Sequence, residues 1–463
     1  MWISLKILVL LWGVNFTPPL LSHFFEDAWG EPLDGGRLWR DGKPLFGPHK
    51  TRRGVAGSLA TGAALSLLIG FPVWLGLVCS ALSMAGDLTS SFIKRRMDLK
   101  SGSLAPGLDQ AFEGLLPFAA LTPCFSLTGW QTARICLVFC IGAYVGSWFF
   151  KTILTASPFD EYPREVHSRV RLKEWRHCRF ESKTLSSLLN FDRYVFYHVF
   201  LRNFFRAFGL YEKGMQNALQ IGLKDVEFSF RDLPKPFDGY TILLLTDLHI
   251  DGLPGLTEKL TECIRGVSVD ICILGGDFRM ETFGTFENAL EQLNRLIPEI
   301  KTRDGVVGVL GNHDCPEIIV PLAKSGVAFL INEARPIIRD GEQIWLLGVD
   351  DPHAYKCDDL NEAINEAPQG AFTILAAHSP ELHGEAASRG IRLYLCGHTH
   401  AGQVQLPVIG PVLTHARCPR EISEGAWSNG EMKGYTSPGV GVSGAPVRFF
   451  SRGEATRITL RRG

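Results

Sequence analysis

Five short clusters of metal-binding residue types follow separate apolar runs in the second half of the 463-residue chain. In chain order these are Asp247-Leu248-His249, Gly276-Asp277, Gly311-Asn312-His313-Asp314, His378 and Gly397-His398-Thr399-His400. Such a mixture of nitrogen and oxygen ligands suits manganese, iron or zinc better than calcium. Two divalent cations about 3.5–4 Å apart can polarise a phosphoryl oxygen and generate hydroxide. The clusters therefore predict a two-metal phosphoesterase site, and Asp277 is the expected bridging carboxylate.

The third cluster also offers groups for acid–base chemistry. His313 follows the expected ligand Asn312 and is left to face the substrate, where it could stabilise charge or protonate the leaving group. Asp314 is expected to orient the His313 ring.

Each cluster has a structural alternative. Asp247 could cap a helix, Gly276-Asp277 could form a turn, and His378 could be a hydrogen-bonded core histidine. Two histidines at i and i+2 after a buried strand are unusual without a metal, and five clusters in order favour the metal site. Other histidines for which a structural or surface role is the stronger interpretation are His353, His383 and His415.

The elements that must position these clusters follow an alternating pattern. Buried strands are predicted at 242–245, 271–274, 306–310, 344–349, 372–376 and 391–395, and an edge strand at 225–230. Helices are predicted at 256–266, 284–298 and 379–389. This alternation predicts a layered α/β architecture with its chemistry on loops at the carboxyl ends of strands.

The ordered clusters resemble the motifs of the calcineurin-like metallophosphoesterase superfamily, over residues 226–463. The resemblance implies a four-layer α/β/β/α sandwich. It assigns one metal to Asp247, His249, Asp277 and His400, and the other to Asp277, Asn312, His378 and His398. Residues 397–407 resemble a membrane-associated branch that includes bacterial phosphodiesterases acting on UDP-diacylglucosamine-type lipids. Arg279 and Glu281 stand where the family often has a second acidic residue, and either could shape the pocket.

The first 155 residues hold long apolar runs. Five membrane spans are expected, at about 3–16, 54–70, 72–86, 111–127 and 134–154. Lysines and arginines concentrate in the segments 22–53 and 87–107. The positive-inside rule then places both segments, and the chain after the fifth span, in the cytoplasm, with the N-terminus outside.

The two basic segments also carry glycines and aspartates, a combination that can hold phosphates and magnesium. The alternative is that the basic residues only set topology and bind anionic lipids. The motifs around Asp34-Gly35-Gly36, Lys50-Thr51, Gly86-Asp87 to Arg96 and Asp109-Gln110 resemble the CDP-archaeol synthase family of five-span membrane cytidylyltransferases. The resemblance implies magnesium-dependent transfer of CMP from CTP to a lipid phosphate. By motif, the phosphate contacts fall to Lys50 and Thr51, the metal to Asp87 and Asp109, and the triphosphate clamp to Lys94 and Arg95, with Asp34 in the same site.

Between the two halves lies a basic and aromatic connector, residues 157–225. Aromatic residues recur every three or four positions in 191–208, which predicts an amphipathic helix at the membrane surface or, alternatively, one packed on the soluble domain. The net charge of −1 gives no support for a nucleic-acid partner. The eleven cysteines include no CxxC pair, which favours reduced thiols over a disulfide framework.

Three domains are therefore expected: a membrane domain at 1–156, the connector, and a phosphoesterase domain at 226–463. The favoured function is a multi-pass enzyme of the cytoplasmic membrane that hydrolyses a lipid-linked phosphoester and also carries a CTP-dependent cytidylyltransferase. One alternative keeps only the phosphoesterase and makes the first half an anchor. Another makes the protein a scaffold that binds nucleotide lipids without turnover.

Overall fold

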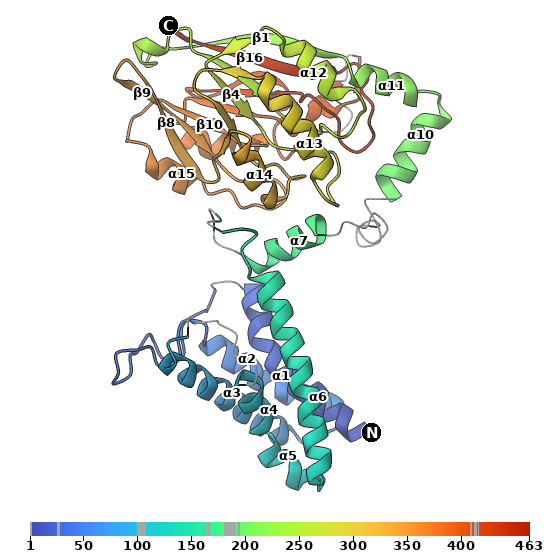
Figure 1. Cartoon of the computed structure of the whole chain (residues 1–463), viewed down its shortest axis with the longest axis vertical. Coiled ribbons are helices and arrows are strands. Elements are labelled where there is room, and N and C mark those ends of the chain that lie inside the picture. The colour runs from blue at the N-terminus through green and yellow to red at the C-terminus, as the bar shows by residue number, and fades with distance from the viewer. Residues whose placement is uncertain are drawn as a thin grey trace. The chain divides into compact units, whose positions relative to one another are not determined.

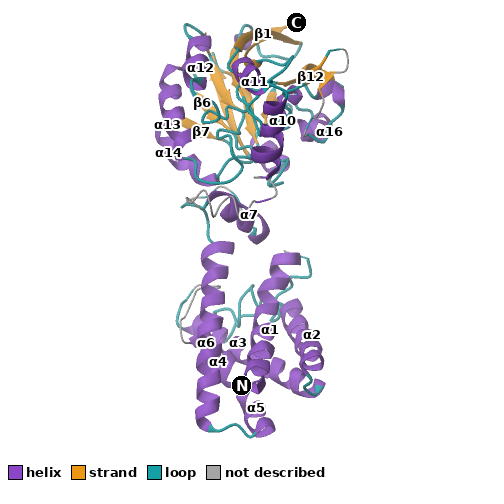
Figure 2. Ribbon diagram, turned by 90° about the vertical axis from the view of Figure 1, so that its right-hand side faces the viewer, coloured by secondary structure: helices purple, strands orange, loops and turns teal. Residues whose placement is uncertain are grey.

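The computed structural model describes residues 2–25, 28–99, 108–160, 162, 164, 167–179, 191, 195–407, 410–411, 414 and 416–463 (Figure 1). The chain forms two compact units. The first comprises Met1–Ala156 with Val166–Leu172, and the second comprises Ser157–Glu165 with Lys173–Gly463. Helices build the first unit, whereas every strand that receives a label belongs to the second (Figure 2).

The helices of the first unit are α1 (Trp2–Phe25), α2 (Arg52–Ile69), α3 (Val73–Arg96), α4 (Leu108–Leu115), α5 (Phe118–Phe125), α6 (Gly129–Phe149) and the π-turn η1 (Phe150–Leu154). Among the described residues, three helical segments are long and apolar enough to cross a membrane: Trp2–Phe25, Val73–Arg96 and Gly129–Leu154. The expected count of five spans is therefore not confirmed.

Helix α1 continues to Phe25 through Pro18 and Pro19, so the expected end at residue 16 is wrong. Pro18 has no N–H to give to the carbonyl of Val14. The hydroxyl of Ser58 on α2 donates to that carbonyl at 3.0 Å. A hydrogen bond from a neighbouring helix thus satisfies the group that proline frees, which lets a proline-containing helix continue in an apolar environment.

Helices α2 and α3 approach closely because small residues face each other. A Cβ atom at Gly62 would collide with Ser80, and one at Gly76 would collide with Ser66. Small residues four apart on each helix are the usual means of close packing between membrane helices. Helix α3 also extends to Arg96, so the Gly86-to-Arg96 motif is helical and does not form the loop that we expected.

The second unit contains two six-stranded sheets. The first has the order β1-β16-β2-β4-β6-β7, and β1 (Ile221–Phe230) lies at its edge as predicted. Its other strands are β16 (Gly453–Arg462), β2 (Thr241–Leu245), β4 (Ile271–Leu274), β6 (Val306–Gly308) and β7 (Val327–Phe329). Strands β2, β4, β6 and β7 pair in parallel, and β16 pairs antiparallel with β2.

The second sheet has the order β14-β15-β11-β10-β9-β8. Its strands are β14 (Gly425–Asn429), β15 (Met432–Thr436), β11 (Leu393–Cys396), β10 (Thr373–Ala376), β9 (Glu342–Gly348) and β8 (Glu333–Arg339). The six buried runs predicted from the sequence correspond to β2, β4, β6, β9, β10 and β11.

Three apolar cores confirm the layered architecture. The first lies between one sheet and the helices α12 (Leu256–Ile264), α13 (Glu287–Leu296) and α14 (Ile319–Lys324). The second joins the facing surfaces of the two sheets, and the third joins the other sheet to α15 (Leu360–Glu366) and α16 (His383–Ser388). The second unit is thus an α/β/β/α sandwich, as expected.

The connector contributes α7 (Ser168–Cys178), the π-turn η2 (Val195–Leu201), α10 (Arg202–Ala207) and α11 (Tyr211–Ala218). Leu201 and Phe205 pack against a small core that contains Tyr211, Ala445 and Val447. Phe204 and Phe208 remain 47% and 66% exposed. One face of the aromatic segment therefore packs on the sandwich, as one alternative expected, while the membrane-surface position of its exposed face stays a prediction.

Candidate metal centre

The expected metal ligands lie on strained turns at strand ends. Asp247, His249, Asp277, His398 and His400 all have positive φ angles, between 38° and 71°. This left-handed region costs a residue with a side chain about 1–3 kcal/mol, and such strain concentrates at functional sites. The tightly packed strands upstream hold the turns in place, so that side chains such as His249 and His400, which are 151 positions apart, converge.

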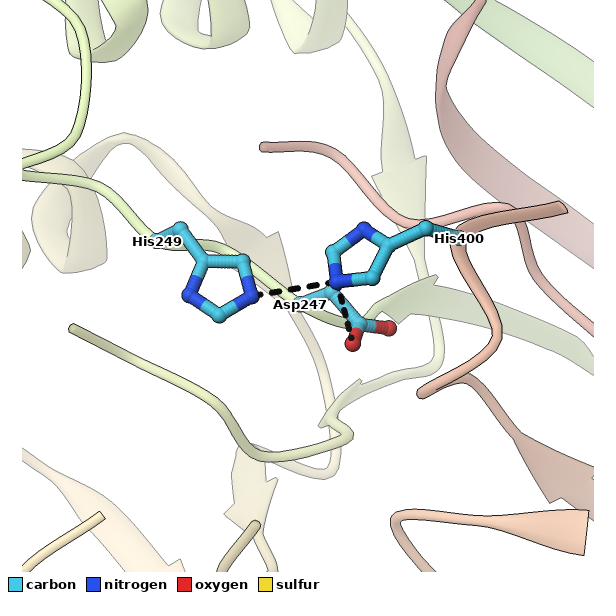
Figure 3. Close-up of side chains that lie close together, drawn as sticks. All are labelled: Asp247, His249 and His400. Atoms are coloured by element: carbon cyan, nitrogen blue, oxygen red, sulfur yellow. Dashed lines mark hydrogen bonds and ion pairs between the residues drawn. The ribbon is translucent and has the colours of Figure 1, made fainter. Parts of the chain in front are cut away.

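One group of ligands gathers around Asp247 (Figure 3). The Nε2 atoms of His249 and His400 lie 3.2 Å apart, and His400 Nε2 lies 3.4 Å from the Asp247 carboxylate. All three side chains are buried. Asp247 is also held by the backbone N–H of His398, which donates to both carboxylate oxygens at 3.1 and 2.9 Å.

A second group gathers around His378. Its Nε2 lies 3.0 Å from Asn312 Oδ1, 3.1 Å from His398 Nδ1 and 3.4 Å from the carboxylate of Asp277. The same Asp277 oxygen lies 3.6 Å from His249 Nε2. Asp277 thus stands between the two groups, at the place that a bridging carboxylate requires.

The hydrogen bonds behind the rings test whether this arrangement suits cations. The Nδ1 atoms of His249 and His378 donate to the carbonyls of Arg279 and Gly275, at 2.7 and 2.9 Å. In the neutral rings each Nε2 then carries a lone pair, and these lone pairs point at carboxylate oxygens and at other ring nitrogens. Acceptors crowded in this way repel one another unless a cation or a proton lies among them. The donor set therefore fits divalent metals, with ring orientation fixed from behind.

The electrostatics of the buried groups agree with a cation-binding centre. Burial alone would raise the pKa of Asp277, but the imidazoles of His313 and His378 outweigh burial and hold that pKa well below its usual value. Burial alone would lower the pKa of His378, but Asp277 outweighs it and raises that pKa well above its usual value. Carboxylate and imidazole thus favour each other's charged forms, and a metal cation can take the place of the imidazole proton.

His313 and Asp314 differ from the expected pair. The Nδ1 of His313 donates to the carbonyl of Met280 at 2.6 Å, so that carbonyl orients the ring. Asp314 instead accepts the backbone N–H groups of Asp277, Phe278 and Gly311 at 2.7 to 2.8 Å. The expectation that Asp314 orients the ring is wrong, because its carboxylate ties the second and third clusters together.

The Nε2 of His313 faces the centre. It lies 3.8 Å from the Asp277 carboxylate and 3.5 Å from Ser443 Oγ. Burial lowers the pKa of His313 to about 3. A ring held neutral beside the ligands can accept or share a proton on Nε2.

Glycine is required at two of the motif positions. A Cβ atom at Gly311 would meet the Asp277 carboxylate and the His378 ring, and one at Gly397 would meet the carboxylate of Asp247. The glycines of the third and fifth clusters therefore make room for the ligands themselves.

Several residues near the centre were not identified from the sequence. The Gln403 side chain joins its own turn to Ser443, accepting from the Ser443 N–H and donating to the Ser443 carbonyl at 3.0 Å. The guanidinium of Arg448 is buried and donates to the carbonyls of Pro438 and Gly441 at 2.7 and 2.6 Å. The spacing Gly439-x-Gly441-x-Ser443 after β15 was a usable signal, because β15 pairs in parallel with β11 and ends beside it.

His353, for which a structural role was favoured, lies beside the ligands. Its ring centroid is 4.1 Å from that of His398, and its Nδ1 lies 2.8 Å from the Glu381 carboxylate. The His383 ring bonds the Pro380 carbonyl of its own turn, and the His383 backbone carbonyl accepts from the Asn429 side chain at 3.2 Å. His415 lies outside the described residues.

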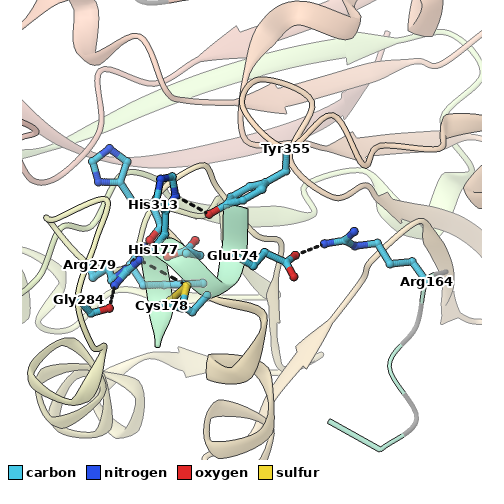
Figure 4. Close-up of a disulfide and its surroundings, with 11 residues drawn as sticks. Arg164, Glu174, His177, Cys178, Arg279, Gly284, His313 and Tyr355 are labelled. Atoms are coloured by element: carbon cyan, nitrogen blue, oxygen red, sulfur yellow. Dashed lines mark hydrogen bonds and ion pairs between the residues drawn. A yellow bond between two sulfur atoms is a disulfide. The ribbon is translucent and has the colours of Figure 1, made fainter. Parts of the chain in front are cut away.

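The prediction of reduced thiols fails for one pair, because Cys178 and Cys315 form a disulfide (Figure 4). The two residues are 137 positions apart in the sequence, so no local spacing of cysteines indicated the bond. Arg279 is fully buried and donates to the carbonyls of His313 and Gly284. Arg279 therefore supports the His313 turn from behind.

In the membrane unit, only part of the expected site comes together. Lys50 Nζ contacts both carboxylate oxygens of Asp87, at 2.5 and 2.6 Å. Lys94 and Arg95 lie on the same helix α3 and are buried. Gly86 lets α4, which carries Asp109, approach α3, because a Cβ atom there would collide with Phe112. The side chain of Asp109 lies outside the described residues.

Two motif residues of the membrane unit have local structural contacts. Thr51 caps α2 by accepting the N–H of Gly54 at 3.1 Å. Asp34 accepts the N–H groups of Gly36 and Phe46, both at 2.9 Å, and so closes its own loop. These contacts correspond to capping and turn formation.

Comparison with known proteins agrees with both halves. Residues 240–402 match the calcineurin-like phosphoesterase family, and residues 16–146 match the CDP-archaeol synthase family. A CDP-archaeol synthase of Thermococcus onnurineus is 42% identical over 118 residues, covering 22% of this chain and 68% of that protein. Among solved structures, an intramembrane enzyme for archaeal membrane lipid biosynthesis is 24% identical over 29% of this chain and 90% of the other, with a TM-score of 0.24.

Two further relatives match the second half. A transmembrane protein with a metallophosphoesterase domain from Danio rerio is 28% identical over 54% of this chain, which spans 59% of the relative's length. The phosphodiesterase YaeI of Escherichia coli is 29% identical over 50% of this chain and 84% of its own length. The membrane half of the chain therefore belongs to the CDP-archaeol synthase-like family, and it is fused to a domain of the calcineurin-like metallophosphoesterase type.

Proposed function

We propose that the second unit hydrolyses a phosphodiester or pyrophosphate bond in a lipid-linked substrate, using two divalent metals. The observation that carries this proposal is the convergence of six ligand side chains with Asp277, with the acceptor atoms of His249 and His378 aimed inward. One metal is assigned to Asp247, His249, Asp277 and His400. The other is assigned to Asp277, Asn312, His378 and His398.

When bound, two such metals polarise the phosphoryl group and lower the pKa of a bound water. The chain's own residues supply orientation and proton transfer. The Met280 carbonyl aims His313 Nε2 toward the centre, beside Ser443. We assign His313 to the leaving-group oxygen; its neutral Nε2 must first accept a proton, which it can then pass to that oxygen. Asp314 acts indirectly, by keeping the backbone of the second and third clusters together.

A lipid-linked substrate is supported by the exposed aromatic face of the connector. We define this face by Phe196, Phe200, Phe204 and Phe208, all of which are exposed, as is Phe450 in the loop between β15 and β16. Arg206 lies within the same segment, with its guanidinium 5.0 Å from the Tyr211 ring. Phe449, next to Phe450, accepts the N–H of Gln405 and donates to the carbonyl of Gln403, which is bonded to Ser443. An aromatic and basic surface so close to the centre suits lipid headgroups and acyl chains.

A second activity is proposed for the membrane unit, namely transfer of CMP from CTP to a lipid phosphate with magnesium. It is favoured by the Lys50–Asp87 pair and by the buried basic side chains of Lys94 and Arg95 on the same helix. Aspartate can hold magnesium and lysine can neutralise phosphate once a nucleotide separates them. We place both basic segments and the phosphoesterase unit on the cytoplasmic side, and no nucleic acid is involved.

The hydrolase is tested with purified full-length protein, manganese and bis(p-nitrophenyl) phosphate. Hydrolysis that a chelator stops and manganese restores supports the proposal. A metal-loaded, folded protein that cleaves neither this ester nor a lipid pyrophosphate contradicts it and favours a binding scaffold.

The transferase is tested with Asp277→Ala protein, magnesium, labelled CTP and a panel of phosphorylated lipids. The substitution prevents hydrolysis of any activated lipid, so label should accumulate in a lipid-soluble product whose mass identifies the acceptor. No label from folded protein would reduce the first unit to an anchor.

A further inference from the structure

We propose that the Cys178–Cys315 disulfide is a reducible clasp that holds the Asn312–His313 turn in its metal-binding geometry. A dithiol reductant would open the clasp and lower hydrolysis. The inference rests on the proposed phosphoesterase function. It makes the disulfide, whose Cys178 belongs to the connector, a regulatory site for that activity.

The first observation is where the disulfide lies. Cys315 is fully buried and comes directly after the Asn312-His313-Asp314 cluster. Cys178 is the last residue of α7 in the connector. The bond therefore ties the connector covalently to the turn that carries one ligand and the expected acid–base group.

Arg279 makes a second link between the same partners (Figure 4). Its Nη2 lies 3.7 Å from Cys178 Sγ, and its Nε donates to the carbonyl of His313. The carbonyl of Arg279 accepts from His249 Nδ1 at 2.7 Å. Displacement of Cys178 would thus shift His313 through the Arg279 side chain. It would also shift His249 through the backbone carbonyl of Arg279.

The end of α7 is also held on two other loops of the site. The His177 carbonyl accepts the N–H of Gly284 at 2.8 Å, and His177 Nδ1 lies 3.2 Å from the Tyr355 hydroxyl. Lys173 donates to the carbonyl of Ala354 at 2.7 Å. Ala354 and Tyr355 follow His353, whose ring lies against the ligand His398.

A buried ion-pair network completes this attachment. Arg164 lies 2.6 Å from Glu174 and 2.6 Å from Asp350, with all three side chains at most 7% exposed. A buried charge left without its partner is strongly destabilising, so these contacts favour a single position of α7. The helix end thereby fixes three loops at once, and the disulfide is its one covalent attachment to them among the described residues.

The chemistry of opening is ordinary thiol–disulfide exchange. One thiolate of the dithiol attacks the half-buried Cys178 sulfur, the S–S bond breaks, and Cys315 leaves as a thiolate that takes a proton. The second thiol of the reductant then displaces Cys178. Two electrons and two protons pass to the protein, which gains two thiols, and the reductant becomes a disulfide. The Asn312–His313 turn is then held by its hydrogen bonds alone.

The test uses full-length protein with its disulfide confirmed by non-reducing peptide mapping. The sample is divided into two portions, and one portion is reduced with dithiothreitol. Because dithiothreitol binds metals, it is then removed, in the absence of air. Both portions are reloaded with manganese. We then measure kcat and KM for bis(p-nitrophenyl) phosphate and manganese affinity. Loss of a partner behind a metal ligand typically costs about 10–100-fold, so reduction should lower kcat or manganese affinity by about tenfold or more. Reoxidation should restore both values.

Variants separate the clasp from general effects of reduction. Cys178→Ser should remain at the reduced level and ignore dithiothreitol, whereas Cys263→Ser, on α12, should respond like the natural protein. Absence of the disulfide-linked Cys178–Cys315 peptide would overturn the clasp. Equal kcat and equal manganese affinity in the oxidised and reduced portions would also overturn it. If the oxidised, manganese-loaded protein hydrolyses nothing, the proposed function fails, and the manganese affinities alone decide on the clasp.

Discussion

The metal centre of the sandwich and the polar cluster of the membrane unit use their motif residues differently. In the sandwich, every expected ligand faces the centre, and backbone carbonyls orient His249, His313 and His378 from behind. In the membrane unit, Lys50 meets Asp87, but Thr51 caps a helix. In the sandwich the expected ligands thus point into one shared centre, whereas Asp314 serves the backbone, as Thr51 and Asp34 do in the membrane unit.

Among the changes that test this difference, Asp277→Ala has the largest expected effect. Removal of the carboxylate that stands between the two ligand groups should lower phosphodiester hydrolysis by about 10³-fold or more, because both metals lose a ligand. Label transfer from CTP should be unchanged. The measurement is both activities on one preparation with its metal content determined. Parallel loss of both activities in folded protein would contradict two independent sites.

Asp87→Asn is the converse change. Loss of a carboxylate at the expected magnesium site should lower label transfer from CTP by about 100-fold or more and leave hydrolysis intact. Asp41→Asn is a suitable control, because Asp41 is not one of the expected site residues and its ion pair is with Arg96 and not with Lys50. Unaltered transfer in the Asp87 variant would show that the Lys50–Asp87 pair is only structural.

His313→Asn separates proton transfer from metal binding. Because His313 Nε2 faces the centre without being an assigned ligand, kcat should fall by about 10²–10⁴-fold while manganese content stays the same. The fall should shrink for a substrate with a better leaving group. Loss of manganese along with activity would instead make His313 a ligand.

The pH dependence of metal binding sharpens the electrostatic part of the comparison. Asp277 raises the pKa of His378, so the metal-free ring keeps its proton to higher pH than an ordinary histidine. Metal must expel that proton, so manganese affinity should increase with pH, by up to about tenfold per pH unit while one proton is released. Titration calorimetry in buffers of different ionisation enthalpy measures the proton count. Affinity that does not change with pH would contradict the assigned charge state.

The smallest effect is expected from Ser58→Ala in the membrane unit. It removes the hydroxyl bound to the Val14 carbonyl and should destabilise α1 near Pro18 by about 1 kcal/mol. Ser66→Ala is the matched control, because that hydroxyl bonds only a carbonyl of its own helix, that of Gly62. Hydrogen exchange in nanodiscs should quicken around residue 18 in the first variant alone.

The sequence by itself determined the ligand types, their order and the strands that carry them. Buried apolar runs of four to six residues that end in polar clusters have few other interpretations, and β2, β4 and β10 follow those runs closely. It also indicated a helical membrane half, because length and apolarity decide which segments can cross a bilayer.

Only the tertiary structure decided which residues are hydrogen-bond and disulfide partners. Asp314 binds three backbone N–H groups that come from two loops, and no spacing in the sequence encodes that contact. The Cys178–Cys315 bond joins residues 137 positions apart. The Ser58 hydroxyl donates to the Val14 carbonyl on another helix, which Pro18 leaves without its helical donor. The reason is physical: periodicity and residue type record local preferences, whereas hydrogen bonds and disulfides depend on which distant segments the packed cores bring together.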